Sequence, residues 1–246
     1  MNPIRPVALI TGASRRIGAT IARTLHAAGY DLALHHRDSH VEMAALVAEL
    51  EAARAGSTLE LRAELAQTDR LPELVAQTLD RFGRIDALVN NASVFFPTPI
   101  GTATPQQWDT LFAANARAPF FLAQAAAPHL RATGGSIVNL VDIYAERPLK
   151  EHTLYCMAKA ALAMLTLSLA KELGPEVRVN GIAPGAVLWP EAGIDSDVQK
   201  SLLAKTALKR AGDPQDVADA ALFLIRDARY TTGEILRVDG GRALAI

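Results

Sequence analysis

The chain has 246 residues, of which 50% are hydrophobic and 21% charged; this composition suits one domain with a sizeable core and excludes a disordered or low-complexity protein. Its 25 basic and 26 acidic side chains leave no net positive field, so we expect no nucleic-acid partner. The single cysteine, Cys156, excludes an intrachain disulfide and a cysteine-based zinc cluster, and we expect no metal.

The most apolar run, residues 160–170, is shorter than the roughly 20 residues that a membrane-spanning helix needs, so we expect no membrane span. The first six residues lead directly into an apolar segment and lack the architecture of a signal peptide. We therefore expect a cytoplasmic protein in which residues 1–246 form a single domain.

Short apolar runs alternate with amphipathic stretches along the chain, and they predict strands and helices respectively. The expected strands are residues 7–10, 31–35, 59–63, 87–89, 136–140, 177–182 and 235–238. The expected helices are residues 17–28, 41–55, 70–82, 105–132 with a bend near Pro119, and 153–173.

This alternation predicts an α/β fold: a doubly wound, seven-stranded parallel sheet of the Rossmann-like kind, with helices on both faces. Such sheets bind ligands beyond the carboxyl ends of their strands. The segment 188–210 interrupts the alternation, and we expect it to form a substrate loop or lid.

A glycine-containing turn follows the first strand, with the sequence Thr11-Gly12-Ala13-Ser14-Arg15-Arg16-Ile17-Gly18. Gly12 permits a tight turn, and Gly18 lets the next helix pack closely on the strand, so that the helix N-terminus faces a pyrophosphate. Arg16 occupies the position of the middle glycine of the usual dinucleotide fingerprint. Because turns with two glycines are common, this segment alone leaves dinucleotide binding open.

The second strand ends in His35-His36-Arg37-Asp38-Ser39. Enzymes that prefer NAD usually have an acidic residue here, whereas a guanidinium can bind the 2′-phosphate of NADPH. Arg37 therefore favours NADPH, although a loop of solvated charges is the simpler alternative. A metal site of His35, His36 and His40 is disfavoured, because the first two alternate faces in a strand and no carboxylate completes the set.

The fourth strand is followed by Asn91-Ala92-Ser93, and then by Phe95-Phe96 in a proline-containing loop. The amides can simply cap turns. The aromatic rings either pack a lid or form a stacking platform for a flat ligand.

Tyr155 and Lys159 lie at i and i+4 on one face of the predicted helix 153–173. An ammonium beside a phenol lowers the pKa of the phenol, so we expect a general acid that works near neutral pH. Asp142 follows the fifth strand, at the same edge of the sheet. Cys156 points off this face and is interpreted as a packing residue.

These residues are similar to those of the short-chain dehydrogenase/reductase family, and the likeness covers essentially the whole chain. The matching residues are Thr11-Gly12 with Gly18, Asn90-Asn91-Ala92, Asn115, Tyr155 with Lys159, Asn180-Gly181, Pro184-Gly185, Thr232-Gly233 and Val238-Asp239-Gly240-Gly241. The resemblance implies hydride transfer to or from a nicotinamide. It also implies that Tyr155 donates a proton, that Lys159 holds the nicotinamide ribose and that Asn115 maintains a proton-relay water.

Asp142 and Arg16 depart from most of the family, which has Ser and Gly at these positions. A serine hydroxyl can donate to a carbonyl oxygen that becomes an alkoxide, whereas a carboxylate would repel it. Asp142 therefore suits a ring nitrogen that needs a proton. Together with His36-Arg37 and Phe95, these departures resemble the pteridine reductase branch, which implies NADPH-dependent reduction of 7,8-dihydropterins, with oxidised pterins and dihydrofolate as further candidates.

The resemblance assigns each site residue a role. The implied catalytic residues are Asp142, Tyr155, Lys159 and Asn115. The implied cofactor contacts are Gly12, Ser14, Arg16, Ile17, Gly18, His36, Arg37, Ser39, Glu64, Leu65, Asn91, Ala92, Ser93, Tyr155, Lys159, Pro184 and Gly185. The implied substrate contacts are Arg16, Ser93, Phe95, Asp142 and Tyr155, with Phe95 stacking the pterin against the nicotinamide. Asp38 stands where the branch tends to have Ser.

Two other functions stay open: a carbonyl reductase of 3-oxoacyl thioesters or sugars, and a non-catalytic regulator that binds NADPH. Asp142 argues against the first, and the intact catalytic set argues against the second. The family also implies a homotetramer. The helical stretches 105–132 and 153–173 carry more Ala and Leu than one buried face requires, which suits packing between subunits.

Overall fold

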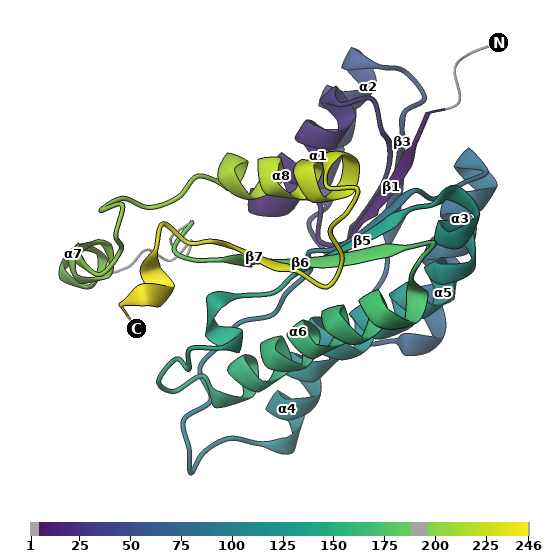
Figure 1. The fold of residues 1–246 in the computed structure, drawn as a ribbon. Helices are drawn as coiled ribbons and strands as arrows, with labels where there is room; N and C mark the ends of the chain where they lie inside the picture. Colours follow the sequence, from purple (N-terminus) through teal and green to yellow (C-terminus); the bar gives the residue numbers. More distant parts are fainter. Residues whose placement is uncertain (1–4, 188–195, 246) are drawn as a thin grey trace.

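The computed structural model of the chain describes residues 5–187 and 196–245. Seven strands form one parallel sheet in the order β3-β2-β1-β4-β5-β6-β7 (Figure 1). The strands are β1 (Val7–Ile10), β2 (Asp31–His36), β3 (Thr58–Arg62), β4 (Ala87–Asn90), β5 (Ser136–Leu140), β6 (Arg178–Pro184) and β7 (Ile235–Val238). This confirms the doubly wound α/β fold expected from the sequence.

Helices cover both faces of the sheet (Figure 1). They are α1 (Arg16–Ala27), α2 (His40–Ala53), α3 (Leu71–Phe82), α4 (Pro105–Phe112), α5 (Ala118–Thr133), α6 (Thr153–Leu173), α7 (Ser196–Ala204) and α8 (Pro214–Leu222). Neighbouring residues of a strand enter different cores: Ile10 packs in the core below α1, α2 and α8, and Leu9 in the core below α3, α5 and α6. The central strands are mostly apolar because both faces are buried.

The helical stretch predicted at residues 105–132 is interrupted earlier than expected. A π-helical turn, η2 (Ala113–Arg117), separates α4 from α5. Pro119 lies in the first turn of α5, directly after the π turn.

Two described helices were not predicted. The helix α8 begins with a capping box in which Asp213 accepts from the Gln215 N–H at 2.8 Å and Pro214 occupies the first turn. This start signal is readable in the sequence. The helix α7 lies in the expected lid segment 188–210, of which residues 188–195 are outside the described residues.

The helix α6 is 21 residues long and, by length and composition alone, is apolar enough to cross a membrane. The apolar run 160–170 did not indicate this, because the helix extends well beyond that run. In the structure α6 lies along the sheet, with Leu162, Leu169 and Leu173 buried. A helix that packs on a sheet can be as long and as apolar as a membrane-spanning helix, so length and composition alone do not distinguish the two.

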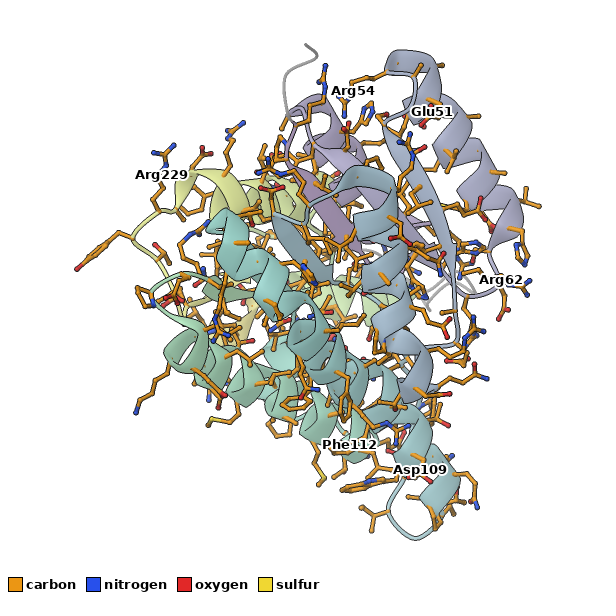
Figure 2. All side chains as sticks on the ribbon, turned by 90° about the vertical axis from the view of Figure 1, so that its right-hand side faces the viewer. Glu51, Arg54, Arg62, Asp109, Phe112 and Arg229 are labelled. Atoms are coloured by element: carbon orange, nitrogen blue, oxygen red, sulfur yellow. The ribbon has the colours of Figure 1, made fainter. Side chains whose placement is uncertain are left out.

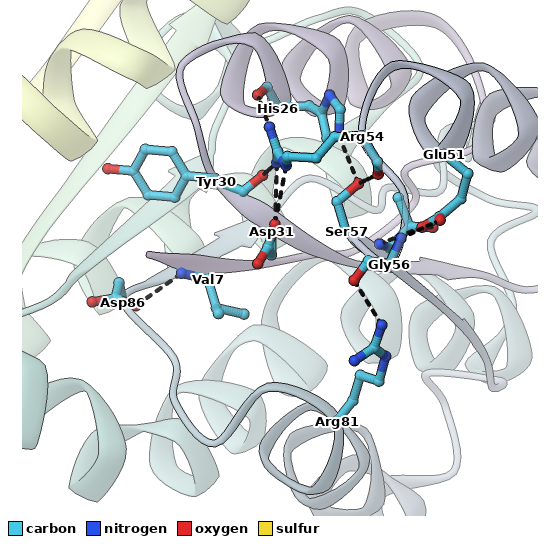
Figure 3. A network of polar contacts seen from close by, with 11 residues as sticks. Val7, His26, Tyr30, Asp31, Glu51, Arg54, Gly56, Ser57, Arg81 and Asp86 are labelled. Carbon is cyan, nitrogen blue, oxygen red and sulfur yellow. Dashed lines mark hydrogen bonds and ion pairs between the residues drawn. The ribbon is translucent and has the colours of Figure 1, made fainter. Parts of the chain in front are cut away.

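A polar network closes the edge of the sheet at the amino ends of β2 and β3 (Figure 3). The Arg54 guanidinium donates to the main-chain oxygens of His26, at 3.0 Å, and of Tyr30, and it is paired with Asp31 at 3.2 Å. His26 Nε2 lies 2.8 Å from Ser57 Oγ. These contacts satisfy the ends of α1 and α2 and leave the opposite edge of the sheet for ligands.

Candidate active site

The turn after β1 packs closely against the end of β4 and the start of α1, and it can do so only because it contains glycine. Gly12 has a φ of +62°, and a Cβ there would lie 2.9 Å from Ala92 Cα. A Cβ on Gly18 would lie 2.2 Å from the Gly12 carbonyl oxygen. The Asn91 side chain donates to the carbonyls of Thr11 and Gly12, both at 2.9 Å, and so fixes the turn to the end of β4. The cradle therefore fits the diphosphate of a dinucleotide at the N-terminus of α1.

Arg16 stands at the first position of α1 with a φ of +53°, in the left-handed region that favours glycine. This is the position where the related fingerprint has glycine. Its side chain is exposed at the opening of the site. The strained backbone indicates that the side chain is retained for a reason other than stability.

Charged groups at the end of β2 surround the predicted 2′-phosphate position. Arg37 Nε donates to Asp38 Oδ2 at 2.7 Å, and Arg37 Nη1 lies 3.5 Å from Glu64 Oε2. The His36 ring is 1% exposed, and its Nε2 lies 2.8 Å from Glu60 Oε1. The predicted contact of His36 with the cofactor could therefore be made only by its backbone. Glu60 also brings a carboxylate near His36 and His40, which the sequence did not indicate.

His35 braces the glycine turn. Its Nδ1 accepts the Gly12 N–H at 3.3 Å, and its Nε2 lies 3.1 Å from the Ala63 carbonyl oxygen. These two contacts require the neutral ring with hydrogen on Nε2. Burial lowers the pKa of His35 to about 4, so the ring stays neutral.

Ser93 and Asn115 meet beside the site. Asn115 lies in the π-helical turn η2, where its side chain is fully buried. It donates to the carbonyls of Val94 and Leu111 at 2.9 Å and accepts from Ser93 Oγ at 2.6 Å. The π turn thus points a polar side chain inward from a helix and joins it to the loop after β4.

Tyr155 and Asp142 form the centre of the site. The Tyr155 hydroxyl donates to Asp142 Oδ2 at 2.7 Å, and Asp142 Oδ1 accepts the Tyr144 N–H at 2.9 Å. Burial raises the pKa of Asp142, against the lowering effects of these hydrogen bonds and of Lys159. The carboxyl group therefore retains a proton to higher pH than an exposed aspartate would.

The expectation that Lys159 lowers the pKa of Tyr155 is wrong for this structure. Burial raises the pKa of Tyr155 well above its usual value, and the charge of Asp142 raises it further. Lys159 Nζ donates to the Leu140 carbonyl oxygen at 2.7 Å and lies 5.8 Å from the centroid of the Tyr155 ring. Burial also lowers the pKa of Lys159 to about 8.

Phe95 stands at the opening of the site with 52% of its surface exposed. Its ring meets Tyr155 edge to face, with centroids 4.8 Å apart. The ring of His152 is stacked on Phe95 at 4.6 Å with an interplanar angle of 13°. Sequence reasoning missed His152; its position three residues before Tyr155 was the available signal.

The remaining predicted residues lie around the same edge. Gly185 directly follows β6 and lies close to the residue that follows β7. A Cβ on Gly185 would be 2.8 Å from Asp239 Cα. Pro184 ends β6, and Leu65 is buried after β3. The structure thus brings the predicted residues to the carboxyl ends of the strands, with the His36 side chain turned away. Cys156 Sγ accepts the Leu149 N–H at 3.3 Å.

A parallel sheet with a glycine turn after β1 and a Tyr–Lys pair on α6 defines an oxidoreductase of the dinucleotide-binding class. A family model described as enoyl-(acyl carrier protein) reductase matches residues 12–243. The chain belongs to the short-chain dehydrogenase/reductase family.

Individual relatives support more than one branch of this family. The chain is 37% identical to "Pteridine reductase 1" of Leishmania tarentolae, over 99% of this chain and 98% of that protein. It is 32% identical to the 3-oxoacyl-(acyl-carrier-protein) reductase FabG of Staphylococcus epidermidis, over 95% of this chain and 97% of that protein. The corresponding FabG of Staphylococcus aureus is 33% identical, over 95% and 96%.

Proposed function

We propose that the protein is an NADPH-dependent pteridine reductase that converts 7,8-dihydropterins to tetrahydropterins, with oxidised pterins and dihydrofolate as further substrates. The observation that carries the proposal is the half-buried carboxyl of Asp142 hydrogen-bonded to Tyr155, beside the exposed ring of Phe95. The likeness to the Leishmania pteridine reductase supports the same branch.

Reduction of a C=N bond needs a hydride on carbon and a proton on nitrogen. NADPH, when bound, supplies the hydride, so this chain has to supply the proton. Tyr155 gives its phenolic proton to the ring nitrogen, and protonated Asp142 restores that proton across their hydrogen bond. An ionised Asp142 would leave two negative charges 2.7 Å apart, so the transfer requires Asp142 in its protonated form.

The protonation state of Asp142 also matters for a ketone. A developing alkoxide needs a neutral or positive donor, and an ionised Asp142 would repel it. The raised pKa of Asp142 extends the pH range in which the acid form is present.

The cofactor would be held along the edge already described. The turn around Gly12 and Gly18 fits the diphosphate, and Arg37 with Ser39 would bind the 2′-phosphate. Lys159 would hold the nicotinamide ribose. The Ser93–Asn115 hydrogen bond fixes the loop against which the ring of the nicotinamide would lie.

Phe95 would stack the pterin. Its ring is stacked on His152 at 4.6 Å, and 52% of its surface stays exposed, which supports a stacking role. The exposed Arg16 lies at the same opening and would contact the pterin edge.

The test is NADPH oxidation with a panel of dihydrobiopterin, dihydromonapterin, dihydrofolate and a β-ketoester. We expect turnover of at least one pterin and little of the β-ketoester. The FabG relatives favour a second candidate, a 3-oxoacyl reductase, and preference for the β-ketoester would establish it in place of the pterin enzyme.

We also propose that four copies assemble. Apolar side chains are exposed on α4, α5 and α6: Trp108, Phe120, Met157, Met164 and Leu167. Trp108 is stacked on Phe112 at 4.2 Å. Phe112 lies at the end of the molecule away from Arg54 and Glu51 (Figure 2). A second copy packed on this face would cover them.

A further inference from the structure

Arg242 is a buried cation outside the proposed proton transfer. It is 4% exposed and begins η5 (Arg242–Leu244), directly after Gly240 and Gly241. The Asp239 carboxylate accepts the N–H groups of Gly241 at 2.9 Å and Ala243 at 2.8 Å. The backbone that carries the guanidinium is therefore held firmly.

The same glycine turn is docked against the segment that follows α7. A Cβ on Gly240 would lie 2.9 Å from Thr206 Cγ2, and one on Gly241 would lie 2.7 Å from Ala207 Cβ. The Leu208 N–H donates to the Gly240 carbonyl oxygen at 3.0 Å. Only glycine allows this contact, so the end of the lid segment and the C-terminal turn form one docked unit.

From this unit the guanidinium reaches in two directions. Arg242 Nη1 donates to the Leu202 carbonyl oxygen of α7 at 3.2 Å, and Nη2 donates to the Tyr144 hydroxyl at 3.4 Å. The Tyr144 N–H in turn donates to Asp142, which accepts the Tyr155 hydroxyl. Tyr144 therefore links the two sides: its hydroxyl is held by Arg242, which contacts α7, and its backbone N–H holds Asp142, which contacts the proton-donating phenol.

Two cations act on the Asp142 carboxylate among the described residues. Lys159 approaches from α6 and Arg242 from η5, and both lower the pKa of Asp142 against the larger raising effect of burial. The Tyr155 hydroxyl and the Tyr144 N–H donate to the two oxygens of Asp142. Glu146, in the same loop, is paired with Arg237 of β7, and both side chains of that pair are about half exposed.

We infer that Arg242 is a positioning residue that couples the docking of α7 to the Asp142–Tyr155 pair. The inference rests on the proposed role of that pair in proton transfer. While α7 is docked, Arg242 holds Tyr144, whose backbone N–H fixes one oxygen of Asp142 and leaves the other for Tyr155. Undocking removes this restraint and a positive charge together, so a ligand that contacts α7 changes the protonation of the pair.

The experiment compares Arg242→Met and Arg242→Lys with the full-length wild type, with Arg237→Met as the control for loss of a nearby arginine. Two quantities are measured with bound NADPH: the pH dependence of kcat/KM and the hydrogen exchange of α7 amides. Arg242→Met should lower kcat about ten- to a hundredfold, with KM less affected, and should speed exchange in α7. In this variant the alkaline limb of the pH profile, where kcat/KM falls, should move to higher pH. Loss of a cation favours the protonated form of Asp142.

Arg242→Lys should restore the position of the limb, and Arg237→Met should leave both readouts as in the wild type. Faster exchange with an unmoved limb would show a mechanical tether alone and would overturn the coupling. If Arg242→Met does not fold, Arg242→Gln removes the same charge and keeps a donor for the Leu202 carbonyl oxygen, and an unmoved limb there overturns the inference. Activity with the β-ketoester but no pterin defeats the proposed substrate, and the Arg242 comparison then proceeds with the β-ketoester.

Discussion

His35 Nδ1 accepts the backbone N–H of Gly12 at 3.3 Å, so a histidine of the second strand holds the first turn of the predicted cofactor site. The contact exists only while the ring is neutral, because a protonated ring carries hydrogen on both nitrogens. Acid should therefore loosen the cofactor turn and the fold together.

The first prediction is loss of stability in acid. The pKa of His35 falls from 6.5 to about 4 on folding, so below pH 6.5 the unfolded chain takes up a proton that the folded chain refuses. The difference between the pKa of His35 in the unfolded and the folded chain corresponds to about 3 kcal/mol of stability. This stability is lost as pH falls from 6.5 to about 4. Urea unfolding at several pH values should show this loss reduced in His35→Gln and unchanged in His129→Gln. Equal acid sensitivity of all three proteins would contradict the assignment.

The second prediction concerns cofactor choice. Asp38 binds the guanidinium that we assign to the 2′-phosphate, so Asp38→Ser should tighten NADPH binding by up to about fivefold, the worth of an exposed ion pair. Arg37→Leu should weaken NADPH binding about ten- to a hundredfold. Nicotinamide fluorescence titrations with NADH provide the control, since neither change should alter NADH affinity much. Parallel effects on both cofactors would exclude a 2′-phosphate contact.

The third prediction is the pH dependence of turnover. Because the transfer needs protonated Asp142, kcat/KM should fall as pH rises through the raised pKa of that group. Asp142→Ser should lower pterin turnover by about 10²- to 10⁴-fold, leave NADPH affinity within a few-fold and improve weak ketone reduction. Steady-state kinetics over a range of pH measure both effects. Full pterin activity in Asp142→Ser would remove the basis of the pterin assignment.

The fourth prediction separates stability from function at Arg16. Glycine adopts a φ of +53° without strain, so Arg16→Gly should leave the free energy of unfolding unchanged or raise it by up to about 1 kcal/mol. The same change should raise KM for the pterin. Thermal unfolding and kinetics are measured on one preparation, and a large loss of stability would show that Arg16 has a mainly structural role.

The fifth prediction concerns assembly. Met164 and Leu167 are 60% and 43% exposed on α6, and replacing both with Glu should dissociate the proposed tetramer. Leu208→Glu adds a charge at a 62% exposed position outside this face and should leave the assembly intact. Light scattering measures the mass of each, and a monomeric wild type at micromolar concentration would refute the proposal.

The inner strands were predictable because both of their faces are buried, which makes them short, mostly apolar runs. The helix α8 was missed although Asp213 and Pro214 mark its start. The π turn was not predictable, because Ala113–Arg117 reads as ordinary helix and only the hydrogen-bond register reveals the extra residue.

The site was predictable where spacing decides it and unpredictable where burial decides it. Tyr155 and Lys159 share a helix face because they are four residues apart. The predicted shift of the Tyr155 pKa was wrong in direction, because the shift depends on how deeply the phenol is buried beside Asp142. Arg242 was missed because its contacts with α7 and Tyr144 join segments distant in sequence.

The π turn at Ala113–Arg117 makes the site sensitive to insertions and deletions as well as to substitutions. Deleting Ala114 would remove the extra residue and let α4 continue into α5 as a regular helix, which would change the position of Asn115 relative to Leu111. Asn115 could then no longer bond both Leu111 and Val94. A deletion that shortens this helix without breaking it would therefore disable the enzyme while preserving every side chain assigned to catalysis.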